Sequence, residues 1–194
     1  MAKRIRTFIA VEISSEVREQ LVGLQEELRA GEASVKWVEP ENLHLTLKFL
    51  GEVDQHELYA VCKAVQREVE SFTPFEMTVA GVGAFPTLRR PRVIWVGITT
   101  GAEELTEIHS ALDKCFRALG YPHEDRRFTP HLTLGRLREI RSGSDLGGAI
   151  ERLARFEAGT SSVRQILVMA SLLTPDGPQY TVMGRAPLAR ASPE

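Results

Sequence analysis

Cysteine is scarce in this sequence, and its scarcity excludes two classes of protein. Only Cys62 and Cys115 occur among the 194 residues, far apart and each within a segment of helical spacing. A disulfide-stapled domain needs a denser cysteine framework, and a zinc knuckle needs a CxxC pair, which this sequence lacks. We therefore expect both cysteines to be reduced thiols packed in the core.

An excess of charge of either sign is also missing. The formal net charge is −2 and the isoelectric point is about 6.2, so the chain lacks the broad basic surface that coats long nucleic acids. Arginines nevertheless cluster locally, at positions 89, 90 and 92, at 126 and 127, and at 136, 138 and 141. These clusters are either solvated loops or a footprint for one or two phosphates, and composition leaves both interpretations open.

A long apolar run is absent too. The segment MAKRIRTFIAVEI begins with basic residues, but its apolar stretch at residues 8–11 already ends at Glu12. This stretch is too short for a signal-peptide core or a membrane span. We expect a cytoplasmic protein without a membrane segment, whose first strand begins almost at once.

An internal repeat is the main feature that the sequence does contain. The tetrapeptide HLTL occurs at residues 44–47 and again at 131–134, a separation of 131 − 44 = 87 positions. The same offset places the strand-like residues 8–11 on residues 95–98, and the helical stripe of residues 14–29 on that of residues 105–119. The half-repeats span approximately residues 5–88 and 92–175.

The later elements follow the same order in both halves. A helix is predicted at residues 54–69, and its counterpart at residues 144–156 is weakened by Gly147 and Gly148. Strands are predicted at residues 75–85, 163–173 and 180–185. We therefore predict one internally duplicated α+β domain over residues 1–194, with a pseudo-two-fold axis between its halves. The alternative is a single α/β domain that happens to contain two similar strands.

Each HLTL strand has two chemically different faces. Alternate side chains of a strand share a face, so the histidine and threonine point one way and the leucines point the other. The pairs His44 with Thr46 and His131 with Thr133 are thus predicted to face a shared cleft, while Phe49 shares the leucine face. The leucines suit the core, and the polar pairs need solvent or a ligand.

Two histidines at one cleft suit a reaction that removes a proton at one end and delivers one at the other. Histidine titrates near neutral pH, so one imidazole can act as base while its partner acts as acid. Displacement at phosphorus has this requirement, because an oxygen nucleophile enters as an oxygen leaving group departs. The threonine hydroxyls can donate hydrogen bonds to the non-bridging oxygens.

Metal binding competes for paired histidines but needs at least one more ligand. His56 and His109 fall on predicted helices, while His123 and Asp125 lie in a loop without ligand spacing. A serine hydrolase is disfavoured as well, because the sequence contains no GxSxG motif. We expect no metal and no other cofactor.

The residues around both motifs resemble one family, the two-histidine phosphoesterases, and within it the RNA 2′,3′-cyclic phosphodiesterases, also called 2′-5′ RNA ligases. The resemblance runs nearly end to end, through RTFIAVEI, VKWVEPENLHLTLKFLGEV, GAFPTLRRPRVIWVGI, RRFTPHLTLGR and SLLTPDGPQYTVMGRAPL. It implies a bilobal α+β fold in which each lobe has an antiparallel sheet and helices, with both HxT motifs in a central groove.

The resemblance also implies roles for five residues. The family hydrolyses a terminal 2′,3′-cyclic phosphate on RNA to a 2′-phosphate without a metal, and on this basis His44 and His131 are catalytic, and Thr46 and Thr133 bind the phosphate. Arg136 matches a phosphate-contacting arginine, although strict alternation puts it opposite His131 unless a bulge near Gly135 reorients it. By analogy His131 is the base and His44 the acid, an order that the sequence does not determine.

Several alternatives stay open at this point. Some family members join tRNA halves by a 2′-5′ linkage, so a ligase, a 2′-5′ phosphodiesterase or a non-catalytic binder of RNA ends or nucleotides would fit the same motifs. We expect RNA ends or cyclic nucleotides as partners, and a monomer. Four aromatic residues near the motifs either stack on a base or pack in the core: Phe8, Trp37, Phe49 and Phe128.

Overall fold

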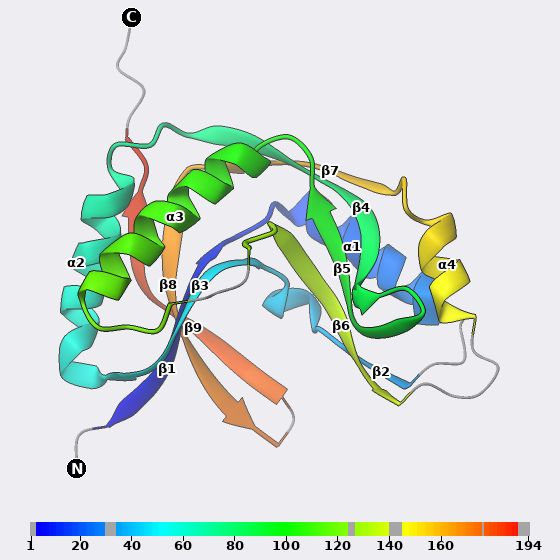
Figure 1. The fold of residues 1–194 in the computed structure, drawn as a ribbon, viewed down its shortest axis with the longest axis horizontal. Coiled ribbons are helices and arrows are strands. Elements are labelled where there is room, and N and C mark those ends of the chain that lie inside the picture. The colour runs from blue at the N-terminus through cyan, green and yellow to red at the C-terminus, as the bar shows by residue number, and fades with distance from the viewer. Residues whose placement is uncertain (1–2, 30–33, 124–126, 140–144, 176, 190–194) are drawn as a thin grey trace, which may run out of the picture.

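The computed structural model describes residues 3–29, 34–123, 127–139, 145–175 and 177–189. Within these residues, nine strands form one curled antiparallel sheet, and four helices cover it (Figure 1). None of the described helices combines the length and the apolar character needed to cross a membrane.

The elements follow the predicted order with a few differences. The strands are β1 (Arg4–Val11), β2 (Ser34–Trp37), β3 (Leu45–Asp54), β4 (Phe75–Thr87), β5 (Arg90–Ile98), β6 (His131–Glu139), β7 (Glu157–Val163), β8 (Gln165–Thr174) and β9 (Gly177–Pro187). The helices are α1 (Ser15–Arg29), α2 (Leu58–Val69), α3 (Ala102–Ala118) and α4 (Leu146–Arg152), and short 3₁₀ turns occupy Pro40–Asn42 and Gln55–Glu57.

Local signals explain where the helices begin and end. The Ser14 hydroxyl accepts a hydrogen bond from the backbone nitrogen of Val17 at 3.3 Å and so caps the N-terminus of α1. Gly120 follows α3 with a φ of 85°, a conformation that favours glycine at a helix C-terminus. The last helix is shorter than predicted, because α4 ends at Arg152 and not at residue 156. Its predicted start at residue 144 lies outside the described residues.

The sheet is arranged around an internal two-fold relation. Its strand order is β7-β4-β5-β6-β3-β1-β8-β9, with β2 paired to β6. At its centre β3 and β6 pair antiparallel through Leu45 and Leu132, which are themselves 132 − 45 = 87 residues apart. A two-fold axis between equivalent strands brings equivalent residues together in this way. The internally duplicated α+β fold is therefore as predicted.

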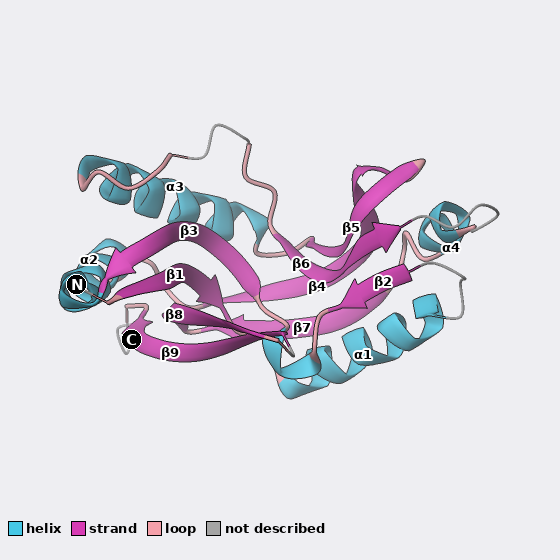
Figure 2. Cartoon of the chain, turned by 90° about the horizontal axis from the view of Figure 1, so that it is seen from below, coloured by secondary structure: helices cyan, strands magenta, loops and turns pink. Residues whose placement is uncertain are grey.

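Each lobe is built from both halves of the chain. The first lobe contains β1, β3, β8 and β9, and the second contains β2, β4, β5, β6 and β7, so that β4 and β8 each pair with strands of the opposite half. Helices α2 and α3 cover the first lobe, and α1 and α4 cover the second, as Figure 2 shows at opposite ends of the sheet. One continuous hydrophobic core lies beneath both lobes.

Both cysteines lie where the sequence analysis expected them. Cys62 of α2 and Cys115 of α3 are free thiols that pack, partly buried, against the core. Burial raises the pKa of each thiol above its usual range, which keeps both protonated and unreactive at neutral pH.

Candidate active site

The two HxT motifs meet where β3 pairs with β6. Leu45 and Leu132 face each other across this pair and are both 0% exposed, so their side chains point into the core. Residues on either side of a paired position point to the opposite face of a sheet. That face therefore carries four partly buried polar side chains, those of His44, Thr46, His131 and Thr133.

Both histidines are held by a hydrogen bond from Nδ1 to a backbone carbonyl two residues earlier. Nδ1 of His44 lies 2.7 Å from the carbonyl oxygen of Asn42, and Nδ1 of His131 lies 2.6 Å from that of Thr129. A carbonyl only accepts, so Nδ1 must donate in both rings, which leaves Nε2 as the nitrogen that can exchange protons with a ligand. Nε2 of His44 lies 2.9 Å from the hydroxyl oxygen of Thr46.

Aromatic rings surround each imidazole. The ring of His44 lies 5.0 Å from Phe8 and 5.3 Å, edge-on, from Tyr180. The ring of His131 lies 5.1 Å, edge-on, from Phe85 and 6.3 Å from Trp95. These contacts fix the orientation of both imidazoles and reduce their exposure to water.

The surroundings of the histidines change their titration. Burial lowers the pKa of His44 below its usual 6.5, the hydrogen bond to Asn42 partly opposes this, and the charge of Arg18 lowers it further. Burial likewise lowers the pKa of His131, with Thr129 opposing and Arg136 adding to the effect. Both imidazoles are therefore neutral at pH 7 without a ligand, and an anionic ligand would raise both pKa values.

A β-bulge directs Arg136 toward the site. In β6, Thr133 pairs with Trp95 and Gly135 pairs with Ile94, so Leu134 is an extra residue that shifts the alternation. Arg136 is exposed, and its charge acts on both His131 and Tyr180. The bulge considered near Gly135 in the sequence analysis is thus present one residue earlier.

Gly135 itself is required by the close approach of β2. A Cβ at this position would lie 2.6 Å from Cγ1 of Val35 and 3.0 Å from the ring of Trp37. A side chain at residue 135 would therefore displace Val35 and Trp37 of strand β2, which the sequence analysis did not predict.

The prediction that Phe49 shares the leucine face is wrong. A second bulge explains the error, because Thr46 pairs with Ala10 and Lys48 with Ile9, which leaves Leu47 as an extra residue in β3. Phe49 consequently pairs with Phe8 on the histidine face, where it is 50% exposed and its ring lies 6.1 Å from that of Phe8.

The same bulge turns Lys48 into the interior. Its side chain is 0% exposed, and Nζ lies 2.6 Å from a carboxylate oxygen of Asp113 and 2.9 Å from the carbonyl oxygen of Pro122. The second carboxylate oxygen of Asp113 lies 2.7 Å from Nδ1 of His123. This buried ion pair joins β3 to α3 and to the loop that leads to β6.

The other aromatic candidates pack within the protein. Phe8 is 3% exposed, Trp37 lies beneath the guanidinium of Arg29, and Phe128 stacks on His109 with ring centroids 4.1 Å apart. Of the four aromatic residues named from the sequence, Phe49 is therefore the most exposed one beside the motifs.

The remaining histidines do not form a metal site within the described part of the chain. His56 is exposed, His109 is buried and bonded to a carbonyl, and His123 pairs with Asp113. No three His, Cys, Asp or Glu side chains gather in a way that could hold a metal ion among the described residues. Asp125 lies outside them.

A large groove begins beside His131. It has a volume of about 1390 Å³ and runs from Trp95, Thr129 and Pro130 along α3 to Arg127. The arginines at 89, 90 and 92 are instead exposed around the β4–β5 turn, and Arg138 is exposed on β6. Arg126 and Arg141 lie outside the described residues.

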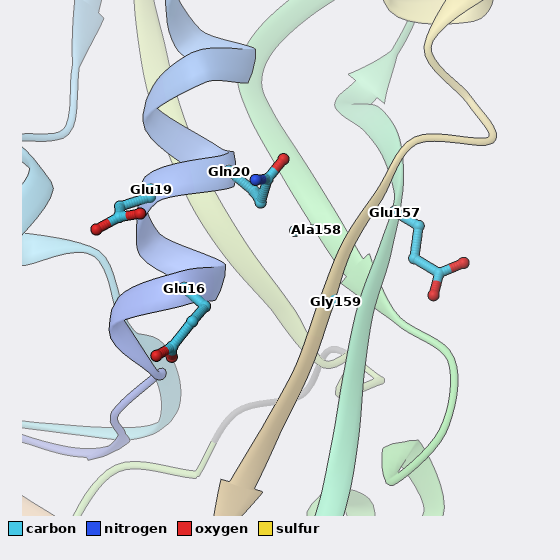
Figure 3. A pocket seen from close by; sticks show the side chains of 6 residues that line it. All are labelled: Glu16, Glu19, Gln20, Glu157, Ala158 and Gly159. Carbon is cyan, nitrogen blue, oxygen red and sulfur yellow. The ribbon is translucent and has the colours of Figure 1, made fainter.

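A smaller depression lies away from the motifs, between α1 and β7 (Figure 3). Its volume is about 470 Å³, and Glu16, Glu19 and Glu157 line it with carboxylates that point apart. No residue of the HxT motifs lines this depression or the larger groove, but Pro130 of the groove adjoins His131, whereas no lining residue of the depression adjoins a motif. The depression is therefore not a candidate for the chemistry.

Sequence reasoning missed several residues of the site. Trp95 lies 95 − 8 = 87 residues after Phe8, so the repeat contained a signal for it. Tyr180 had no such signal, because its contact with His44 depends on how the β8–β9 hairpin packs. That hairpin is held by Asn42, whose side-chain amide donates to the carbonyl of Pro178 at 3.0 Å.

Comparison with known proteins gives consistent relatives. A family model described as LigT like Phosphoesterase matches the chain twice, over residues 11–95 and 96–180. An RNA 2′,3′-cyclic phosphodiesterase of Methanothermobacter thermautotrophicus is 37% identical over 180 residues, covering 93% of this chain and 97% of that protein. One of the same name from Archaeoglobus fulgidus is 37% identical over 176 residues, covering 91% and 96%.

Solved structures agree in fold over nearly the whole length. A crystal structure of a Thermus thermophilus protein matches with a TM-score of 0.79 and 31% identity, covering 94% of this chain and 97% of that one. The crystal structure of E. coli LigT complexed with 3′-AMP matches with a TM-score of 0.75 and 25% identity, covering 97% and 100%.

Proposed function

As the chain belongs to the LigT-like phosphoesterase family, we propose that it is an RNA 2′,3′-cyclic phosphodiesterase that hydrolyses terminal 2′,3′-cyclic phosphates to 2′-phosphates. One observation carries the proposal. Two imidazoles, each tethered through Nδ1 to a carbonyl so that Nε2 can accept or deliver a proton, share one face of the sheet with two threonine hydroxyls. This is the equipment that in-line displacement at phosphorus requires.

In the proposed reaction the two histidines have opposite tasks. Nε2 of His131 accepts a proton from water as the water oxygen attacks phosphorus. The bond from phosphorus to the 3′ oxygen breaks, and Nε2 of His44 delivers a proton to that oxygen, so that a 2′-phosphate remains. The catalytic cycle is complete when His131 has lost its proton to solvent and His44 has gained one from solvent. This order follows the family resemblance, and the reverse order would use the same groups.

The phosphate itself is proposed to bind between three donors. The hydroxyls of Thr46 and Thr133 and the guanidinium of Arg136 can donate to the non-bridging oxygens, where negative charge gathers in the transition state. The phosphate charge would also raise the pKa of His44, which the acid needs because it starts neutral. Phe49 is proposed to stack on the base of the terminal nucleotide.

The proposal is tested by identifying the product. Purified protein should convert a 2′,3′-cyclic phosphate oligonucleotide to a 2′-phosphate in the presence of EDTA, read by chromatography against both phosphate isomers. Loss of activity on chelation, restored by a divalent metal, would overturn the metal-free mechanism. A joined 2′-5′ product would identify a ligase, and tight binding without product a non-catalytic binder.

Variants of the histidines test the assignment of roles. His44→Ala and His131→Ala should each lower kcat by about a hundredfold or more, because each removes a positioned acid or base. His56→Ala is the matched control, since His56 is exposed on a 3₁₀ turn outside the site. Near-normal turnover of either active-site variant would remove that histidine from the chemistry.

Two further properties belong to the proposal. We expect the enzyme to act as a monomer, tested by light scattering, and in the cytoplasm, tested by cell fractionation.

A further inference from the structure

The two bulges that follow the HxT motifs share an unusual support. Leu47 and Leu134 are the extra residues, and they occupy equivalent positions, 134 − 47 = 87 residues apart. Nδ1 of His109 on α3 lies 2.8 Å from the carbonyl oxygen of Leu47. Nε2 of Gln25 on α1 donates to the carbonyl of Leu134 at 2.9 Å. The carbonyls of these two equivalent leucines are thus each bound by a side chain from a helix, but the two side chains differ in type.

Gln25 makes a specific contact at its bulge. It is 2% exposed, and its Nε2 also donates to the carbonyl of Val38 at 2.8 Å. Both partners are carbonyls that only accept, so the amide nitrogen must face them. The backbone nitrogen of Val38 also donates to the Leu134 carbonyl, at 2.9 Å. Gln25 therefore adds a side-chain tie, from within the core, to the backbone tie between the bulge of β6 and the segment that follows β2.

The bulge decides which side chain of β6 lies on the face that carries His131 and Thr133. One extra residue in a strand reverses the alternation of every side chain beyond it. Without Leu134 as an extra residue, Arg136 would point to the core face with Leu132. With it, Arg136 lies on the face of His131 and influences that imidazole electrostatically.

His109 supports the other bulge and also reaches the second motif. Its ring, 8% exposed, stacks on Phe128 with an interplanar angle of 6°. Phe128 directly precedes Thr129, whose carbonyl holds Nδ1 of His131. His109 therefore touches both the strand that carries the first motif and the segment that tethers the second histidine.

We propose that Gln25 and His109 are positioning residues. They hold the two bulges and so place Arg136 and Phe49 on the face of the sheet that carries the two histidines. Neither side chain reaches the reacting atoms. The effect of these residues on activity rests on the proposed function. Their effect on the bulges does not, because the bulges are a property of the fold.

A double-mutant cycle between Gln25 and Arg136 tests the inference. Gln25→Met keeps the side-chain volume and removes both donated hydrogen bonds, and it should lower kcat/KM between about tenfold and a hundredfold through misplacement of Arg136. In the Arg136→Ala background the same change should have no further effect, because nothing remains to be positioned. Gln20→Met, an exposed change on α1, is the control and should leave kcat/KM unchanged.

Two results would overturn the inference. Equal losses in the wild-type and Arg136→Ala backgrounds would mean that Gln25 contributes only general stability, and an unchanged kcat/KM would mean that the bulge does not depend on it. Gln25→Asn, which keeps the amide but shortens its reach, replaces Gln25→Met if the latter does not fold.

A crystal structure of the Gln25 variant separates this inference from the proposed function. If the wild-type protein has no phosphodiesterase activity, the proposed function has failed. If Arg136→Ala leaves kcat/KM unchanged, the proposed role of Arg136 has failed. The register of β6 then decides the inference by itself. A strand that has lost the bulge at Leu134 supports it, and an unchanged register overturns it.

Discussion

The buried ion pair between Lys48 and Asp113 leads to a quantitative prediction about stability. Lys48 is 0% exposed, and after Asp113→Ala its ammonium would retain, among the described residues, the carbonyl of Pro122 as its one hydrogen-bond partner. An uncompensated buried charge costs about 3–5 kcal/mol of unfolding free energy. For a chain of this size each kcal/mol corresponds to about 2–4 °C, so the melting temperature should fall by roughly 6–20 °C.

The assay is thermal unfolding followed by circular dichroism, with two comparison variants. Lys48→Met combined with Asp113→Ala should recover most of the loss, because removing both charges leaves nothing unpaired. Glu104→Ala, an exposed change on α3, should alter stability by less than about 0.5 kcal/mol. A loss below about 1 kcal/mol for Asp113→Ala, or a double variant as unstable as the single one, would refute the reasoning.

The pair should also respond to pH in one direction. Burial raises the pKa of Asp113, but the hydrogen bonds and charges of Lys48 and His123 outweigh it and leave the pKa lowered. The contribution of Asp113 is therefore present above its unfolded pKa of about 3.9 and is lost as pH falls through the lower folded value. The stability gap between wild type and Asp113→Ala should narrow in that acidic window and not between pH 6 and 8.

Three further predictions concern activity. Because burial lowers the pKa of both His44 and His131 below 6.5, kcat/KM should follow a bell with its maximum below pH 6.5, and a single sigmoid or a maximum above pH 8 would contradict the acid and base pair. Thr46→Val removes the hydroxyl beside Nε2 of His44 and should lower kcat by about a hundredfold, measured at saturating substrate. Phe49→Ala should raise KM by about fivefold or more for a nucleoside cyclic phosphate but leave KM unchanged for a cyclic ribose phosphate without a base.

Much of the fold could be predicted because the repeat reinforced weak local signals. The strands at residues 8–11, 75–85 and 95–98 and both long helices were found by periodicity, and their positions are confirmed. Strand β7 was missed because its segment, EAGTSSV, is rich in small polar residues that resemble a loop. Its pairing with β4 depends on contacts that no local pattern contains.

At the candidate site, the alternation of side chains along a strand predicts the correct face only for residues before a bulge. His44 and Thr46 precede the bulge at Leu47, so their shared face followed from simple counting. Phe49 follows it, and counting put its side chain on the wrong face. The Leu47 carbonyl at this bulge accepts a hydrogen bond from His109 of α3, a contact between two elements that the sequence of the strand itself does not contain.

The two HxT motifs are related by an approximate two-fold axis, but the reaction proposed for them needs an acid on one side and a base on the other. Phe49 and Arg136 occupy equivalent places after the two bulges, 136 − 49 = 87 residues apart, but one is aromatic and the other cationic. This unmatched pair gives a scaffold with matched histidines two chemically different ends. We expect a nucleoside cyclic phosphate to bind with its phosphate toward Arg136 and its base toward Phe49, which would give the substrate one preferred orientation.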